Sequence, residues 1–358
     1  MRLLKMGLLS ALMILASPVA PATDAETHSP ACKAAAGLEF ICGLKNAEDL
    51  VRIPNTNWVI TSSMGEPSDS RKLFLIDVTK RTTAELYPGS KPQVKLDKKT
   101  FSSCPGAPDL KNLTTHGLAI QRRAEKLHRL FVTTHGAREA VEVFDVAVGE
   151  SLPSITWVGC VPMPPMTFIN SVAPLPSGGF VVTKMMDSPT DRASFKQLVA
   201  GKVTGFVYAW HPGTGLVRLR GTDLSGPNGI ETSADGKQIY VSSWGTSEVV
   251  RFARDSGYFS EKGRVKLPMR PDNLRWTDEG RLLATGQVLA APDVDCGSMA
   301  CFAGWAVVDV DFANMQTQTL LDGDANASFS GATVALSLPT QLLIGTFHGD
   351  RIAVAPRR

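Results

Sequence analysis

The chain has 358 residues, of which 43% are hydrophobic and 20% charged, a composition typical of a folded globular protein and not of a disordered one. Its formal net charge is only +3, and its lysines and arginines are dispersed, which argues against a nucleic-acid partner. The 31 glycines and 23 prolines are typical of a turn-rich β protein, either two domains or one large all-β domain.

The first segment, residues 1–22, has the pattern of a signal peptide. Arg2 and Lys5 precede the apolar run Met6–Ala16, and small residues follow it. An uncleaved anchor is the alternative, but the apolar run is too short to span a bilayer. We therefore predict export to the periplasm or the outside, with residues 23–358 as a single mature domain. No other stretch is long and apolar enough to cross a membrane.

After residue 44 one order of elements recurs six times: a polar residue, an inner strand, a turn, and two or three further strands. The expected inner strands are Leu50–Ile53, Thr115–Ile120, Phe168–Ala173, Ile230–Thr232, Pro271–Trp276 and Gly331–Ser337. Repeats of roughly 45 to 70 residues built from antiparallel strands are typical of propeller blades with insertions. The sequence therefore predicts an all-β, six-bladed β-propeller.

The clearest repeat is Gly226–Arg254. It predicts a tight turn at Pro227–Gly229, a hairpin at Asp235-Gly236, and strands at Gln238–Ser242 and Glu248–Phe252. Helical periodicity is confined to Asp191–Val199, which excludes an α/β fold.

Polar residues with side-chain oxygens begin most of the repeats. If these starts meet at one end of a central channel, the oxygens of five residues converge: Glu48, Asn170, Asn228, Asp272 and Asn273. Carboxylate and amide oxygens suit Ca²⁺, and the absence of histidine and cysteine from the set disfavours zinc. Asparagine and aspartate also serve as turn residues, but their recurrence at one point of the repeat favours a metal site.

Two histidines belong to the second repeat. His116 opens its inner strand and His135 ends the next strand, so antiparallel pairing would bring both to one rim. A neutral imidazole can activate water while a second one orients it. The alternative is that both are loop histidines packed under the rim.

The six cysteines can pair in an oxidising compartment. We expect Cys296 with Cys301, Cys32 with Cys42 and Cys104 with Cys160, one of fifteen possible pairings.

With these residues identified, the chain from Glu48 onward resembles the paraoxonase/arylesterase family, within the senescence-marker, gluconolactonase and strictosidine-synthase-like propellers. The matching motifs are Glu48–Leu50, His116–Leu118, Thr134-His135, Ile169-Asn170, Pro227–Ile230 with Ser233–Lys237, Asp272–Leu274, Gly331–Val334 and Leu342–Thr346. The resemblance implies that the five oxygen residues hold a catalytic calcium and that His116 and His135 form the base pair. It also implies hydrolysis of lactones, with aryl esters and phosphotriesters as secondary substrates.

Two departures from that family concern a second calcium and ring closure. The resemblance implies a structural calcium held by Asp49, the Leu118 carbonyl and an aspartate after Asn170, but Ser171 stands in that last place. No cysteine follows Cys301, so closure of the ring requires strand pairing or another bridge.

The sequence leaves three functions open: a calcium-dependent lactone or aryl-ester hydrolase, a sugar-lactone hydrolase, and a non-catalytic propeller that binds a ligand or protein. The insert Met185–Thr204 and the loop Cys296–Cys301 would supply the binding surface of the last. For an enzyme, we expect an apolar pocket rim drawn from Met163, Met166, Phe168, Met185 and Trp244.

Overall fold

The computed structural model describes residues 32–65, 72–255, 258–289, 304–324 and 328–357. The predicted signal peptide and the Cys296–Cys301 pair lie outside these residues. Residues 32–358 form one compact unit. Within the described residues, no helix is long and apolar enough to cross a membrane.

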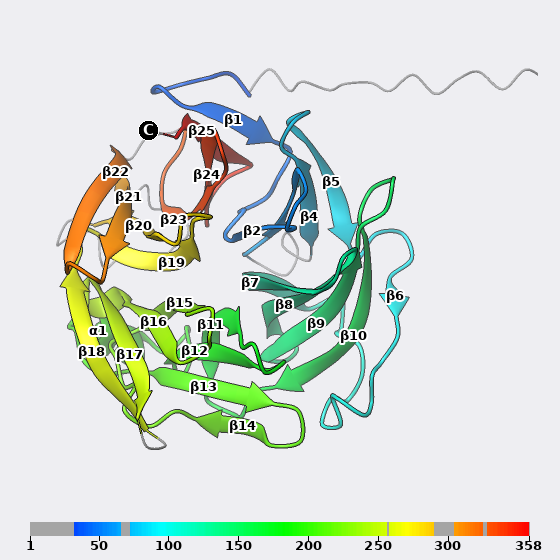
Figure 1. Ribbon diagram of the computed structural model, residues 1–358, viewed down its shortest axis with the longest axis horizontal. Coiled ribbons are helices and arrows are strands. Elements are labelled where there is room, and N and C mark those ends of the chain that lie inside the picture. Colours follow the sequence, from blue (N-terminus) through cyan, green and yellow to red (C-terminus); the bar gives the residue numbers. More distant parts are fainter. Residues whose placement is uncertain (1–31, 66–71, 256–257, 290–303, 325–327, 358) are drawn as a thin grey trace, which may run out of the picture. The chain divides into compact units, whose positions relative to one another are not determined.

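In the described residues, six sheets are arranged radially around a central axis, and their strands are antiparallel except for one short pairing in blade 2, which confirms the six-bladed propeller (Figure 1). Blade 1 contains β2 (Leu50–Arg52), β3 (Trp58–Ser62), β4 (Leu73–Asp77) and β5 (Thr82–Tyr87). Blade 2 contains β7 (Leu113–Ala124), β8 (Leu127–Gly136), β9 (Ala140–Ala147) and β10 (Ser154–Pro162), with β6 (Gln93–Val94) parallel to β10. Blade 3 contains β11 (Phe168–Pro174), β12 (Phe180–Met186), β13 (Phe206–His211) and β14 (Gly215–Arg218).

The other three blades have the same plan. Blade 4 contains β15 (Pro227–Thr232), β16 (Gln238–Ser243), β17 (Glu248–Asp255) and β18 (Tyr258–Lys266). Blade 5 contains β19 (Arg270–Trp276), β20 (Leu282–Val288), β21 (Gly304–Asp311) and β22 (Gln316–Gly323). Blade 6 contains β23 (Ala332–Ser337), β24 (Gln341–Thr346), β25 (Arg351–Pro356) and β1 (Glu39–Cys42). The inner strands β2, β7, β11, β15, β19 and β23 lie side by side around the axis.

Strand pairing closes the ring. The N-terminal strand β1 pairs antiparallel with the C-terminal strand β25, from Glu39 opposite Val354 to Cys42 opposite Arg351. The first strand of the described chain is therefore the outermost strand of the last blade. The expected disulfides Cys32–Cys42 and Cys104–Cys160 are both present, and they anchor the segment before β1 and the connection before β7.

The hydrophobic core lies between the faces of neighbouring blades, because each sheet buries both of its faces there. Aromatic side chains fill the space between blades 2 and 3, where Phe180 stacks on Trp210 and Trp210 stacks on Phe101. These apolar layers leave the polar residues of the inner strands to face the axis.

Two local predictions differ in outcome. The helix α1 (Arg192–Val199) is present, and the side chain of Asp191 caps it by accepting from two backbone amides of its first turn. The turn predicted at Pro227–Gly229 is wrong, since these residues form the first half of β15. Tertiary pairing with β16 extends the strand through a segment whose local sequence favours a turn.

Candidate functional site

Four of the five predicted ligand residues, and His116, lie in β-bulges, whereas Glu48 lies just before β2. Pairing between the inner strand and its neighbour breaks register between Thr115 and Leu118, Ile169 and Val172, Pro227 and Ile230, and Pro271 and Leu274. His116, Asn170, Asn228 and the pair Asp272-Asn273 fall inside these four breaks. A bulge bends the strand and redirects its side chains. The same irregularity in four blades therefore turns these side chains toward one point on the axis.

Close backbone approach between blades fixes the bulges. A Cβ on Gly117 would lie 2.4 Å from the Asn170 carbonyl oxygen, and one on Gly229 would lie 2.3 Å from the Asp272 carbonyl oxygen. Threonines of the second strands add hydrogen bonds across the blade boundary. Thr133 donates to the Asn170 carbonyl at 2.6 Å and Thr183 donates to the Asn228 carbonyl at 2.7 Å. Each asparagine is thus held by the blade before it.

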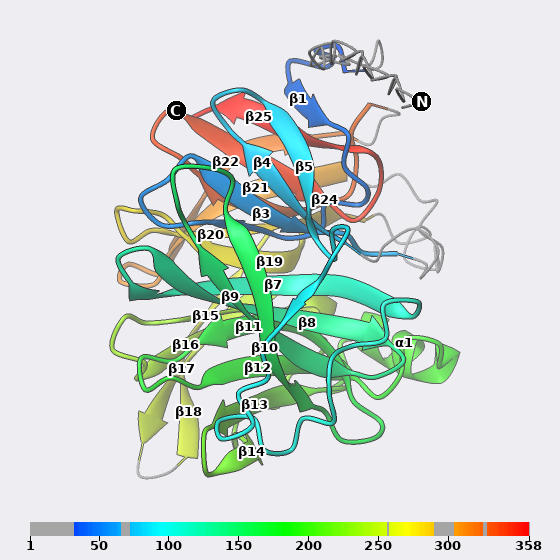
Figure 2. The same ribbon diagram turned by 90° about the vertical axis from the view of Figure 1, so that its right-hand side faces the viewer.

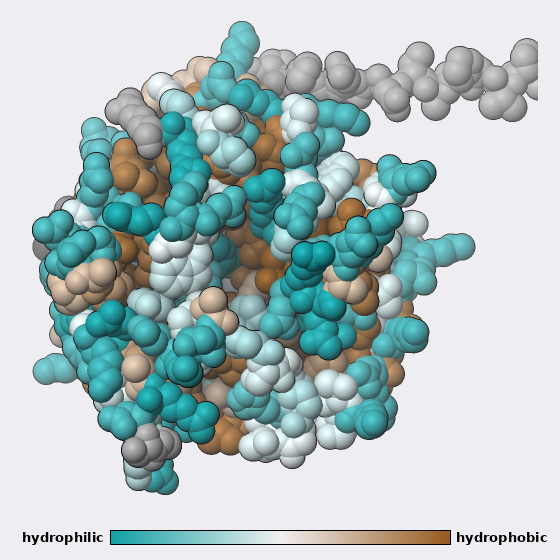
Figure 3. Space-filling view, viewed as in Figure 1, coloured by the Kyte–Doolittle hydropathy of each residue, from teal (hydrophilic) through white to brown (hydrophobic). Residues whose placement is uncertain are grey.

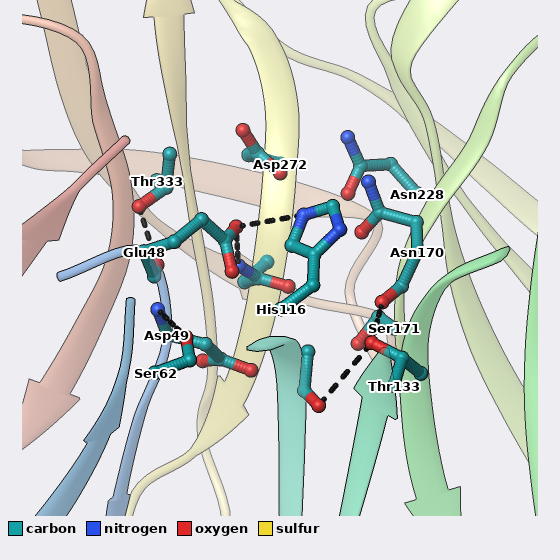
Figure 4. Close-up of polar contacts among 12 residues, drawn as sticks. Glu48, Asp49, Ser62, His116, Thr133, Asn170, Ser171, Asn228, Asp272 and Thr333 are labelled. Atoms are coloured by element: carbon teal, nitrogen blue, oxygen red, sulfur yellow. Dashed lines mark hydrogen bonds and ion pairs between the residues drawn. The ribbon is translucent and has the colours of Figure 1, made fainter. Parts of the chain in front are cut away.

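All five predicted metal ligands are buried, with 1–8% of each residue exposed. Figure 4 shows Glu48, Asn170, Asn228 and Asp272 around a common space beside His116. Each of the five retains one buried oxygen without a hydrogen-bond partner: Glu48 Oε2, Asn170 Oδ1, Asn228 Oδ1, Asp272 Oδ1 and Asn273 Oδ1. Buried acceptors without partners are costly and rare. Five in one cluster fit a hard cation that takes oxygen ligands.

Hydrogen bonds to the remaining atoms of the carboxylates orient them. Asn273 Nδ2 donates to Glu48 Oε1 at 2.7 Å, and Gln287 Nε2 donates to Asp272 Oδ2 at 2.8 Å. Trp244 Nε1 in turn donates to Gln287 Oε1 at 3.0 Å. One oxygen of each carboxylate is therefore held by the protein, and the other stays available. The sequence interpretation missed Gln287, because only the pairing of β19 with β20 reveals its position.

The electrostatics of the set also favour a cation. Burial and, next to it, the nearby Glu48 carboxylate raise the pKa of Asp272 to about 8. A divalent cation would stabilise the charged form of both groups. Among the described residues, no three or more histidine, cysteine or carboxylate side chains gather into a metal cluster. A site of two carboxylates and three amides suits calcium better than zinc.

The two histidines meet at the same place. His116 Nδ1 lies 2.8 Å from His135 Nε2, and His116 Nε2 lies 3.5 Å from Glu48 Oε1. The other nitrogen of His135, Nδ1, lies 2.9 Å from both oxygens of Glu139. Glu139 follows His135 across the turn between β8 and β9, and the sequence interpretation missed it.

Glu139 determines which ring nitrogens carry protons. Because a carboxylate only accepts, His135 donates from Nδ1 and its Nε2 is an acceptor. His116 then donates to it from Nδ1, which leaves the lone pair of His116 on Nε2, facing the cluster of oxygens. Burial lowers the pKa of His116, but the carboxylates of Glu48, Asp272 and Asp49 together outweigh burial, and the net shift is upward. Burial lowers the pKa of His135, and Glu139 only partly opposes this. A proton taken up by the pair therefore rests on His116.

A comparison of the sequence with models of protein families identifies the family of this chain. The model of the Arylesterase family matches residues 32–352. The chain belongs to the arylesterase family. The comparison with curated protein sequences found no match.

Solved structures show that the fold is shared widely. A putative gluconolactonase has a TM-score of 0.54 and 14% identity, over 90% of this chain and 93% of that one. A gluconolactonase from Xanthomonas campestris has a TM-score of 0.54 and 18% identity, over 89% of each chain. A luciferin-regenerating enzyme also reaches 0.54, at 13% identity, over 89% of this chain and 95% of that one. At these identities the likeness concerns the fold alone.

Apolar side chains border this site. Figure 2 places α1 on one face of the propeller, and Figure 3 shows a hollow at the centre of the opposite face. Met185 and Trp244 form an apolar cluster with Leu198 of α1, and Phe168 packs against that cluster. Phe168 also stacks on His135, with ring centroids 4.5 Å apart. Three of the five predicted rim residues thus share one apolar cluster, which reaches the histidines through Phe168.

The other two predicted rim residues are placed differently. Met163 packs against the core around blades 2 and 3, and Met166 is 67% exposed.

The residues implied for a second calcium do not fit one. Asp49 and the Leu118 carbonyl both accept hydrogen bonds from the buried guanidinium of Arg275. The sequence interpretation of this set missed Arg275, which lies on the inner strand of another blade.

Proposed function

We propose that the chain is a calcium-dependent hydrolase of lactones and aryl esters, in which His116 activates water. Membership of the arylesterase family supports ester or lactone hydrolysis as the reaction class. One observation above all supports the proposal that calcium binds here. Five buried oxygens lack hydrogen-bond partners, one on each of Glu48, Asn170, Asn228, Asp272 and Asn273. Calcium held there would polarise the substrate carbonyl and offset the negative charge that develops on its oxygen.

The histidines supply the proton transfers. The lone pair of His116 Nε2 takes a proton from water, whose oxygen forms the new bond to the carbonyl carbon. His135 keeps the His116 ring oriented by accepting from its Nδ1, and Glu139 keeps His135 in the tautomer that can accept. When the ester or lactone C–O bond breaks, His116 returns the proton to the leaving alkoxide or phenoxide.

Secretion or a periplasmic location belongs to the same proposal. The signal-peptide pattern of residues 1–22 supports it, and the two disulfides are compatible with an oxidising compartment. The partner expected in that compartment is a small lactone or ester. Phe168 and Trp244 at the rim favour substrates with apolar substituents over sugar lactones.

The first prediction concerns calcium removal. Hydrolysis of phenyl acetate and a panel of aliphatic lactones by the purified protein should disappear in EGTA and return with added CaCl₂. Asn273→Ala should lose at least about 100-fold in kcat/KM, roughly 3 kcal/mol of transition-state stabilisation, because Asn273 also orients Glu48.

The matched control is Asn314→Ala, which removes an exposed asparagine from the turn before β22 and should leave the rate unchanged. Full activity of the wild type in EGTA would contradict a calcium-dependent mechanism. Flat traces with every substrate and with added calcium would favour the non-catalytic binding propeller.

A further inference from the structure

A buried arginine lies at the hub of the propeller. Arg275, on β19, is only 5% exposed. Its guanidinium group meets five oxygens: Leu50 O at 3.0 Å from Nε, Leu274 O at 2.7 Å and Glu231 Oε1 at 3.4 Å from Nη1, and Asp49 Oδ1 at 2.5 Å and Leu118 O at 2.9 Å from Nη2. A guanidinium has five N–H donors, so every donor has a partner.

These contacts join the inner strands of four blades. Asp49 directly precedes β2, Leu118 lies on β7, Glu231 on β15 and Arg275 on β19. Both carboxylate oxygens of Asp49 also accept hydrogen bonds from backbone amides. Oδ1 accepts from the Leu50 amide at 2.8 Å, and Oδ2 accepts from the Leu118 amide at 2.7 Å. Arg275 is thus a positively charged, non-covalent cross-link between the inner strands of four blades.

We propose that Arg275 is a built-in cation that takes the place of the second, structural calcium implied by the family resemblance. Asp49 Oδ1 and the Leu118 carbonyl cannot hold Ca²⁺ at 2.3–2.6 Å while a guanidinium binds both. Ser171 further deprives the set of a carboxylate, although its buried hydroxyl has no partner. The hub of the propeller is therefore independent of metal, and only the site of the five unpartnered oxygens takes calcium. The expectation of one bound calcium ion per chain rests on the proposed function, whereas the role of Arg275 does not.

The experiment exchanges the arginine for a metal site. The double variant Ser171→Asp/Arg275→Ala removes the guanidinium and restores a carboxylate beside Leu118, because the Ser171 backbone abuts Gly117. Calorimetric titration with CaCl₂ of the full chain should give one equivalent per wild-type chain and two for the double variant. The melting temperature of the double variant should also rise more on adding calcium than that of the wild type.

Further variants separate the possible outcomes. Arg275→Lys keeps the charge but loses the planar fork, so it should lower the melting temperature by the same amount with calcium and with EGTA. Arg281→Ala, which removes an exposed arginine paired with Asp309, should change neither quantity. If the double variant does not fold, the wild-type stoichiometry and Arg275→Lys decide.

Three results would each overturn the role of Arg275. The first is two calcium equivalents bound by the wild type, and the second is a double variant that binds no more calcium than the wild type. The third is a loss of stability in Arg275→Lys that depends on calcium. Zero equivalents in the wild type and one in the double variant would contradict the proposed catalytic calcium and support the role of Arg275.

Discussion

At the scale of single residues, Glu139 holds His135, the histidine that contacts the proposed base His116. Its two oxygens lie 2.9 Å from His135 Nδ1, and His135 in turn lies 2.8 Å from His116. A carboxylate in this position fixes one tautomer and stabilises positive charge on the pair. We therefore propose Glu139 as a positioning residue, one contact removed from the proposed base His116.

The second prediction follows from this chain of contacts. Glu139→Gln should lower kcat by about 10–100-fold, equivalent to roughly 1.4–2.7 kcal/mol, because its amide group can also present a donor to His135 and favour the wrong tautomer. Calcium affinity should stay within about twofold of the wild type, since Glu139 contacts none of the five ligand side chains.

The pH–rate profile distinguishes a positioning role from a structural one. Loss of the Glu139 charge should move the acidic limb of the profile to lower pH, because the protonated histidine pair loses a stabilising carboxylate. Glu125→Gln, in the exposed turn between β7 and β8, is the control. An unchanged acidic limb with an unchanged rate would show that Glu139 does not set the state of His135.

At the scale of elements, the repeated bulge explains what the sequence could and could not predict. The order of strands and polar residues predicts the six blades, which the structure confirms. It also predicts which polar residues and histidines meet at the axis. That these residues bind calcium and act as a base stays a prediction. The same pattern gave a turn at Pro227–Gly229, because a bulge within a strand has the local sequence of a turn. Gln287 and Arg275 carry no local signal, since their partners lie on other strands and other blades.

The third prediction tests the bulge. Gly229→Ala should destabilise the fold by about 1–3 kcal/mol, because the new Cβ would lie 2.3 Å from the Asp272 carbonyl oxygen. Separation of β15 from β19 should also move Asn228 away from Asp272 and weaken calcium binding by at least about tenfold, or roughly 1.4 kcal/mol.

Thermal unfolding and calcium titration measure the two effects. Gly149→Ala is the matched control, because a Cβ there meets no atom within 4 Å. Normal stability and normal calcium affinity of Gly229→Ala would mean that the close approach of β15 and β19 does not position the ligands.

At the scale of the whole molecule, the propeller depends on polar contacts at its axis as well as on the apolar layers between its blades. Strand β1 closes the ring at its outer edge, where it completes blade 6. Arg275 connects blades 1, 2, 4 and 5 at the centre through Asp49, Leu118 and Glu231. The titration of these buried carboxylates should therefore appear in the stability of the entire domain.

The last prediction is that stability falls with rising pH because of Glu231. Burial raises the pKa of Glu231 to about 7 from an ordinary 4.5, although Arg275 opposes the shift. The folded protein then holds a proton that the unfolded chain releases, so the stabilising contribution is fully present below pH 4.5 and is lost as pH rises through 7.

Glu231→Gln mimics the protonated form at every pH. In saturating calcium, its melting temperature should match the wild type at pH 5 and exceed it by a few degrees at pH 8. Glu248→Gln, at the ion pair with Arg264 on blade 4, should show no such trend. A difference between Glu231→Gln and wild type that is the same at both pH values would mean that Arg275 keeps Glu231 charged throughout.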